Sequence, residues 1–313
     1  MLKFIIKRIL SIIPTLFIVA AIAFFLIRLV PGDPAVMLVG DLQDAEILEE
    51  VRIRMGLYEP IYVQFLIWLG NILQGDFGTS IMTGEAVLPA LMDRFLVTAQ
   101  IVLLSVSVAM IIAIPLGMLA AWKQNSSTDF LITSVIILSL SLPSFWVGIM
   151  LILYFGVTLE WLPTVGYATL SEGFWLHMSY LVLPVSSLVL GEMATITRMM
   201  RSSTIETLRL EYITHARAKG IKESIVLRRH AFKNSFAPSL TVLGLILGHL
   251  LGGAAVTETV FSLPGLGRFM VESIYARDYP VVQGAMLLIA GIYVFVNLII
   301  DLLYPIFDPR VKL

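Results

Sequence analysis

The sequence predicts an all-α integral membrane protein. Of its 313 residues, 58% are hydrophobic and 14% are charged, whereas about 25% of the residues in an ordinary soluble domain are charged. The apolar residues gather in charge-free runs that reach the roughly 17 to 25 residues a helix needs to cross the hydrocarbon core. The spanning segments are expected to be helices because lipid offers backbone amides no partner outside the segment.

These runs predict six transmembrane helices, at residues 9–27, 96–122, 130–159, 177–197, 235–257 and 281–300. The fourth contains one acid, Glu192. The first is expected to be retained rather than removed as a signal peptide. Its apolar run exceeds the usual core of about 7 to 15 residues, and no small-x-small cleavage motif precedes the turn at residues 31–34.

Lysine and arginine indicate the orientation. With the N-terminus inside, the cytoplasmic segments hold 15 basic residues and the outer loops hold five. The positive-inside rule then places both termini in the cytoplasm. We expect the chain to have three regions. Residues 1–95 hold the first helix and a large outer loop, residues 96–306 hold five helices, and residues 307–313 form a cytoplasmic tail.

The first outer loop is acidic and is predicted to contain two short helices. Residues 44–55 suit a helix capped by Asp44 and ended by Gly56, and Pro60 opens a second amphipathic segment that runs to Gln74. We expect these helices to lie on the membrane surface or to cover the bundle. Docking of an extracytoplasmic partner is the alternative.

The long cytoplasmic loop at residues 198–236 holds nine of the basic residues. Helix formers at 212–219 are interrupted by Gly220, so two short helices hinged at this glycine are expected, with Pro238 marking the entry to the fifth span. Four apolar residues recur near the helical period and predict a stripe: Ile221, Ile225, Phe232 and Phe236.

Two readings of this loop are open. Its cations could simply meet anionic lipid headgroups. The side chains at 216, 218 and 220 are, however, too small to anchor in lipid and suit close approach to another protein. We therefore favour a docking role.

The same segment resembles the cytoplasmic coupling motif of ABC importer permeases, in the version found in peptide permeases. The matching residues are Tyr212, Thr214, Ala216, Arg217, Ala218, Lys219, Gly220, His230, Ala231, Asn234 and Pro238. The general importer motif begins Glu-Ala-Ala, where this chain has Thr214-His215-Ala216. That departure points toward the peptide and nickel branch of the importers.

Further segments resemble the B-type permease subunit of dipeptide and oligopeptide importers. They are residues 31–34 (PGDP), residues 75–78 (GDFG), Glu258 with Phe261, residues 264–267 (PGLG) and residues 277–281 (RDYPV). Each alone is a common turn or helix stop. Their order and spacing together carry the resemblance, which covers nearly the whole chain.

The resemblance implies a type I ABC importer permease fold with six transmembrane helices in a bacterial inner membrane. It implies three kinds of protein partner: a homologous second permease subunit, two ATP-binding subunits and an extracytoplasmic substrate-binding protein. The residues implied to couple to the ATPase are Glu211, Tyr212, Thr214, Ala216, Arg217, Ala218, Lys219 and Gly220. Transport would proceed by alternating access, with short peptides as the expected substrate and glutathione or nickel chelates as alternatives.

The chain itself is expected to be a transport subunit and not an enzyme. It has no G-x-x-x-x-G-K-[ST] phosphate loop, so ATP and Mg are expected on the partner subunits, and no cofactor or nucleic acid on this chain. Cysteines are absent and the four histidines, at 177, 215, 230 and 249, are scattered. No metal site or catalytic residue is therefore predicted.

Glu192 is a candidate for the substrate path because ionisable residues within a span are functional candidates by default. His249, beside glycines, suits helix packing instead. An ion-coupled secondary transporter is the alternative of a different class. It would be expected to show internal repeats and paired charges in its spans, and neither is found.

Overall fold

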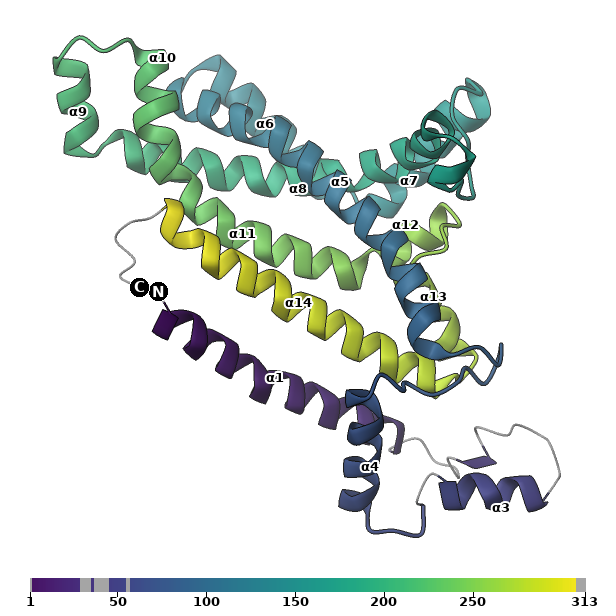
Figure 1. Cartoon of the computed structure of the whole chain (residues 1–313). Coiled ribbons are helices and arrows are strands. Elements are labelled where there is room, and N and C mark those ends of the chain that lie inside the picture. The colour runs from purple at the N-terminus through teal and green to yellow at the C-terminus, as the bar shows by residue number, and fades with distance from the viewer. Residues whose placement is uncertain (1, 29–34, 37–44, 55–56, 308–313) are drawn as a thin grey trace. The chain divides into compact units, whose positions relative to one another are not determined.

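A computed structural model describes residues 2–28, 35–36, 45–54 and 57–307 of the chain (Figure 1). The predicted features at residues 31–34, at Asp44, Met55 and Gly56, and in the tail at 308–313 lie outside these ranges. The described residues form helices connected by loops, with one isolated antiparallel bridge between Thr79 and Ala86. The α-helices of six residues or more are α1 (Leu2–Arg28), α3 (Ala45–Arg54), α4 (Ile61–Leu73), α5 (Val87–Trp122), α6 (Ser127–Ser141), α7 (Ser144–Leu151), α8 (Phe174–Leu208), α9 (Glu211–Ala218), α11 (Phe232–Gly253), α12 (Ala255–Val260), α13 (Leu266–Tyr275) and α14 (Tyr279–Phe307).

Four further helical segments are short α-helical, 3-10 or π-helical pieces. They are the π-helix η1 (Ile152–Thr158), the 3-10 turn η2 (Leu170–Glu172), the single-turn α10 (Glu223–Ile225) and the π-helix η3 (Val226–Ala231). The short helices predicted in the first outer loop are present as α3 and α4, and Pro60 caps α4 as expected.

Five of the six predicted spans lie in helices that are long and apolar enough to cross a membrane. Four are single helices, at residues 87–122, 174–208, 223–252 and 279–303, and the fifth is a bent pair. The first predicted span lies in α1, whose described apolar part, Leu10–Leu26, is a shorter helix. The chain is therefore an all-α membrane protein. The first predicted span, in α1, and the orientation of the chain stay predictions.

The predicted span at 130–159 is not one straight helix. It consists of α6 and the α7–η1 segment, which are bent by 94° relative to each other. The break falls at Pro143, and a proline is a common cause of a sharp bend in a helix. Leu142, just before it, adopts an extended conformation with φ −96° and ψ 123°, because a following proline disfavours the helical region for the preceding residue.

The sequence predicts that Pro238 marks the start of the fifth span, and this prediction is wrong. The helical segment already begins at Glu223 and continues through η3 into α11, with Pro238 inside α11. The part of the charged loop from Glu223 onward and the membrane helix therefore form one continuous helical segment.

The chain divides into two compact units, and each is described by itself. The first unit comprises residues 98–264 and the chain from residue 295 onward, and the second comprises residues 2–97 and 265–294. In the first unit, α8 packs along α11 on one side and contacts α6 and α7 (Figure 1). Gly117 of α5 permits a close approach to α8, since a Cβ there would lie 2.6 Å from the Met200 Cβ.

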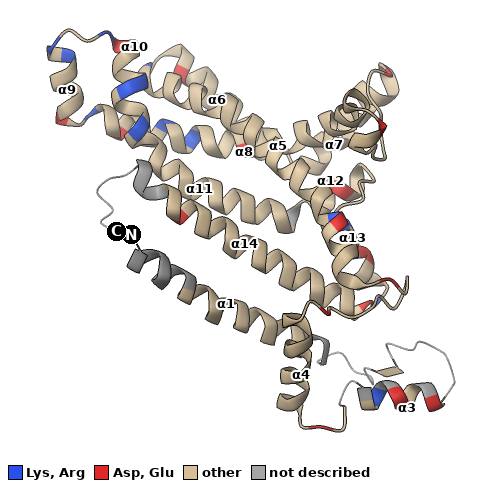
Figure 2. Cartoon of the chain, in the orientation of Figure 1, with Lys and Arg blue, Asp and Glu red and all other residues tan. Residues whose placement is uncertain are grey.

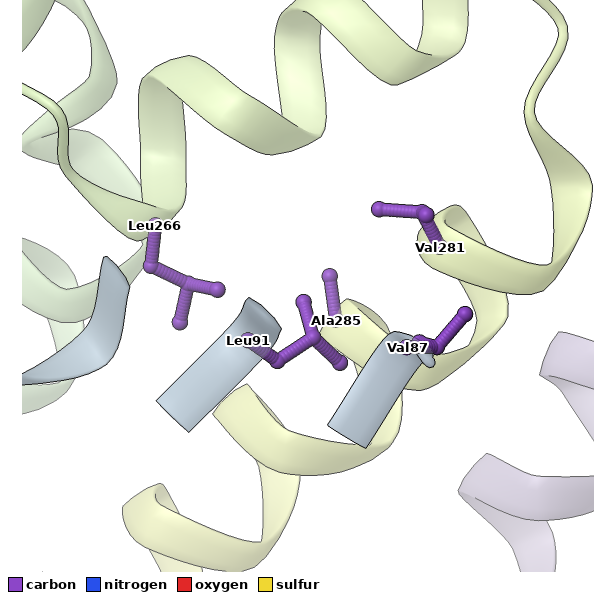
Figure 3. Close-up of a cluster of buried hydrophobic side chains, with 5 residues drawn as sticks. All are labelled: Val87, Leu91, Leu266, Val281 and Ala285. Atoms are coloured by element: carbon purple, nitrogen blue, oxygen red, sulfur yellow. The ribbon is translucent and has the colours of Figure 1, made fainter. Parts of the chain in front are cut away.

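The second unit has a buried apolar cluster at the start of α5. Figure 3 shows its members pointing toward one another from α5, α13 and α14: Val87, Leu91, Leu266, Val281 and Ala285. Beside the start of α14, the Asp278 carboxylate accepts hydrogen bonds from Ser80 Oγ at 2.5 Å and from the Ile81 amide at 3.2 Å. The turn at residues 80–82, which follows the GDFG segment, is thus bound by the RDYPV segment about 200 residues later in the sequence.

Candidate functional site

The candidate site is the hairpin at residues 211–231, formed by α9, the turn at Gly220, α10 and η3. We call it the α9–η3 hairpin. It confirms the predicted pair of short helices hinged at a glycine. Figure 1 shows α9 and α10 as two arms joined by the turn.

Local sequence accounts for the start and the end of α9. Glu211 lies in its first turn, and His215 and Arg217 lie in its last turn, the arrangement that the helix dipole favours. At the end, the Gly220 amide donates to the Arg217 carbonyl at 2.9 Å and the Ile221 amide donates to the Ala216 carbonyl at 3.3 Å. These two bonds form a Schellman motif, whose left-handed position is filled by Gly220 at φ +71°.

A small apolar core holds the two arms together. Its buried members are Ile213 and Ala216 from α9, and Val226 and Ala231 from η3. Leu208, Tyr212 and Ile221 pack against this core and are partly buried. The hairpin is therefore a folded unit with its own interior.

The eight predicted coupling residues occupy two environments in the hairpin. Tyr212 and Ala216 face the interior. The other six are exposed: Glu211, Thr214, Arg217, Ala218, Lys219 and Gly220. A Cβ placed on Gly220 would meet no atom within 4 Å, so the turn presents open backbone to its surroundings.

The predicted apolar stripe is only partly correct. Phe236 is buried as expected, but Ile225 is 44% exposed, and Val226 is fully buried in its place. The π-helix explains the difference. Its i→i+5 bonding changes the angular spacing of side chains, so a stripe drawn at the period of 3.6 residues loses its phase across residues 226–231.

Two sets of side-chain bonds tie the arms together. The Arg217 guanidinium binds Glu223 through two bonds, Nη2 to Oε1 at 2.6 Å and Nε to Oε2 at 3.1 Å. The bond to Glu223 raises the pKa of the Arg217 guanidinium. The Tyr212 hydroxyl accepts a bond from Asn234 Nδ2 at 2.6 Å and donates to the His230 carbonyl at 3.2 Å. Sequence spacing did not indicate a role for Glu223.

Positive charge gathers at this end of the first unit. Figure 2 shows Lys and Arg on α9, around α10 and on the neighbouring part of α8. The exposed basic residues of the hairpin and the start of α11 are Arg217, Lys219, Lys222, Arg228, Arg229 and Lys233. The surface can attract an acidic protein face or anionic headgroups.

Glu192 lies apart from the hairpin. It is half-buried in α8, 16 residues before that helix ends at Leu208, or about 24 Å at the helical rise of about 1.5 Å per residue. Its place on a substrate path stays a prediction. Within the described ranges, no group of three or more His, Asp, Glu or Cys side chains could hold a metal ion.

Comparison with known proteins places the chain in a family. The sequence model for "Binding-protein-dependent transport system inner membrane component" matches residues 113–313, and the model for the N-terminal region of such membrane components matches residues 1–103. The dipeptide transport system permease protein DppB of Alkalihalophilus pseudofirmus is 37% identical over 332 residues, with 100% of both chains covered. The glutathione transport system permease protein GsiC of Escherichia coli (strain K12) is 38% identical over 312 residues, covering 100% of this chain and 99% of that protein.

A solved structure supports the fold. A chain of the MetNI methionine ABC transporter, in an inward-facing conformation, superposes with a TM-score of 0.57 at 17% identity, covering 70% of this chain and 96% of that chain. The sequence relatives are named as transport permeases, which agrees with a transport subunit and not an enzyme. The chain belongs to the family of binding-protein-dependent transport system inner membrane components, the permease subunits of ABC transporters, and to its peptide and dipeptide permease group.

Proposed function

We propose that the chain is one permease subunit of an ATP-driven importer that moves short peptides across the bacterial inner membrane. Its relatives act in dipeptide and glutathione transport systems by name. Short peptides are the favoured substrate class, and glutathione, itself a small peptide, is the second candidate. The importer would further contain a second permease subunit, two ATP-binding subunits and a substrate-binding protein.

The α9–η3 hairpin is the observation that carries this proposal. It is a compact helical unit with its own buried core, and its exposed arm ends in the open turn at Gly220. The small exposed side chain of Ala218 and the glycine at the tip let a partner's surface approach the backbone closely. Such a unit can be docked in a cleft of an ATP-binding subunit and moved with it as a body.

The continuity of the helical structure supports alternating access as the mechanism. The hairpin passes into α11 without a break, so displacement of its tip is delivered to a membrane helix. Closure of the ATP-binding subunits would move the hairpins of both permease subunits and open the path outward, and ATP hydrolysis would reverse the movement. A transition of this kind requires an element with two positions that both sites bias.

The test is Gly220→Val in the complete complex in vesicles, with ATP hydrolysis and peptide uptake measured together. We expect uptake per ATP hydrolysed to fall at least tenfold, because a β-branched side chain would block the docking face. The control is Gly84→Val, since Gly84 also has φ +71° and open space around it. That variant carries the same backbone strain in the predicted outer loop and should keep the wild-type ratio.

Unchanged uptake by Gly220→Val at normal expression would refute the docking assignment. Uptake by this chain alone, driven by an ion gradient without ATP or partner chains, would refute the importer itself and support a secondary transporter.

A further inference from the structure

A bridge centred on the Tyr212 hydroxyl joins the hairpin to the start of α11. The Tyr212 oxygen accepts from Asn234 Nδ2 at 2.6 Å and its hydrogen is directed to the His230 carbonyl at 3.2 Å. A phenol can fill both roles at once because it has one donor hydrogen and free lone pairs. Through this atom, α9 is bonded to η3 and to the first turn of α11.

The bridge lies where the π-helix changes into an α-helix. At this junction the carbonyls of three successive residues accept side-chain hydroxyl bonds. His230 accepts from Tyr212, and Ala231 and Phe232 accept from Ser235 Oγ at 3.0 and 3.2 Å. Bonds of this kind stabilise the altered backbone pattern of a π-turn, a feature that is often found at functional sites.

The connection of α9 to α8 differs in kind. The two helices are joined by Arg209 and Leu210, whose amides donate to the Glu206 and Thr207 carbonyls at 3.2 and 3.1 Å. Leu208 adds an apolar contact to the hairpin core. In the described part of the chain, the side-chain hydrogen bonds of α9 join it to residues 223, 230 and 234, which all lie on the α11 side.

We propose that the Tyr212–Asn234 bridge makes α9 and α11 one mechanical body, so that Asn234 is a positioning residue for ATPase coupling. The inference rests on the proposed function and adds the route by which movement of the hairpin enters the membrane. Movement passes from α9 through the bridge and the hairpin core into α11. The connection between α8 and α9 bends to allow it. The two separated parts of the sequence motif, around Tyr212 and around Asn234, then act together through one hydrogen-bonded contact.

The experiment uses Tyr212→Phe and Asn234→Ala in the assembled importer in vesicles. Tyr212→Phe removes both bonds and keeps the ring in the hairpin core, and Asn234→Ala removes one bond from an exposed side chain. We expect uptake per ATP hydrolysed to fall about three- to tenfold in each, the range that the loss of a hydrogen bond or two allows. The double variant should fall no further than Tyr212→Phe alone, because both changes remove the same bridge.

The control is Tyr275→Phe, because that tyrosine is 85% exposed at the end of α13. Its ratio of uptake to hydrolysis should equal the wild-type value. The ratio also separates positioning from folding, since a variant that only lowers the amount of folded complex lowers uptake and hydrolysis together.

The outcomes distinguish the two proposals. Wild-type ratios in both bridge variants, with coupling lost in Gly220→Val, would overturn the bridge and leave the importer assignment standing. An equal fall of uptake and hydrolysis in Asn234→Ala would assign the bridge a structural role only and overturn the inference. Absence of ATP-dependent uptake by the wild-type complex would instead overturn the proposed function.

Discussion

Asp129→Ala tests whether the ion pair between α6 and α8 stabilises the protein through its burial. Asp129 accepts bonds from Arg201 Nε and Nη2, both at 2.7 Å, and from the Asn125 amide at 3.0 Å. Its side chain is 7% exposed, and that of Arg201 is 28% exposed. The pair therefore fixes a loop and two helices at one point with little access to water.

The expected cost follows from these exposures. Removal of one partner from a fully buried pair costs about 3 to 5 kcal/mol, because the other charge is left uncompensated. The guanidinium of Arg201 keeps some contact with solvent, so we expect about 2 to 3 kcal/mol. With an unfolding entropy of about 2.1 cal/mol/K per residue, this lowers the midpoint of thermal unfolding by about 3 to 5 °C in a chain of 313 residues.

The chain contains a matched control. Arg268 Nε lies 2.7 Å from Glu272 Oε1, the same distance as in the Arg201–Asp129 pair, but these side chains are 33% and 56% exposed. Exposed pairs of this kind contribute about 0.5 kcal/mol. Glu272→Ala should therefore lower the midpoint by about 1 °C or less.

The assay is the fraction of chain that stays monodisperse in detergent after heating, measured as a function of temperature. Equal shifts for Asp129→Ala and Glu272→Ala would refute the reasoning, because burial would then have no effect at a fixed distance. Asp129 also lies in the first turn of α6, so Arg201→Met is measured beside it. If Arg201→Met has no effect, the loss in Asp129→Ala belongs to the helix start and not to the ion pair.

Three further changes test other parts of the structure. Gly117→Val should prevent α5 from packing on α8 and reduce the yield of folded protein severely, as detergent size-exclusion profiles would show, because its Cβ would lie 2.6 Å from the Met200 Cβ. Ile213→Ala should cost about 2 to 5 kcal/mol within the hairpin core, and Ile225→Ala, at a 44% exposed position, well under half of that; limited proteolysis of the hairpin compares them. Asp278→Ala should release the turn at residues 80–82 that its carboxylate binds and raise the rate of protease cleavage there in intact vesicles, while a wild-type rate would show that the turn holds without it.

The membrane helices and the α9–η3 hairpin could be predicted because their signals are local. Charge-free runs reflect the cost of polar groups in lipid, and that cost applies to each segment separately. Gly220 was predictable for a similar reason, since a helix that ends in a left-handed residue strongly favours glycine. The bend at Pro143 depends only on the residues beside it.

The remaining features depend on partners that are distant in the sequence. Asp129 and Arg201 are separated by 72 residues and Ser80 and Asp278 by 198, and nothing in the spacing of such residues indicates the pairing. Glu258 is fully buried and accepts a bond from Thr98 Oγ1 at 2.6 Å, yet it directly follows a charge-free run and so lies outside the predicted span.

The hydrogen bonds of α8 and α11 give the proposed route of movement a physical basis. Two buried hydroxyls of these helices are satisfied within their own helix: Thr197 Oγ1 donates to the Met193 carbonyl at 2.7 Å, and Ser235 Oγ donates to the Ala231 carbonyl at 3.0 Å. Between the two helices, the Ser239 hydroxyl lies 3.4 Å from the Met200 sulfur, a weak acceptor.

The strong side-chain hydrogen bonds therefore lie within two pairs of helices, α6 with α8 and α9 with α11. The Asp129–Arg201 pair holds α6 to α8, and the Tyr212–Asn234 bridge holds α9 to α11. The described contact between α8 and α11 is mainly van der Waals packing with this one weak bond, so a small displacement along it breaks no strong hydrogen bond. Each pair of helices therefore keeps its internal arrangement, while the two pairs can slide relative to each other. The proposed movement of α9 and α11 as one body requires this behaviour.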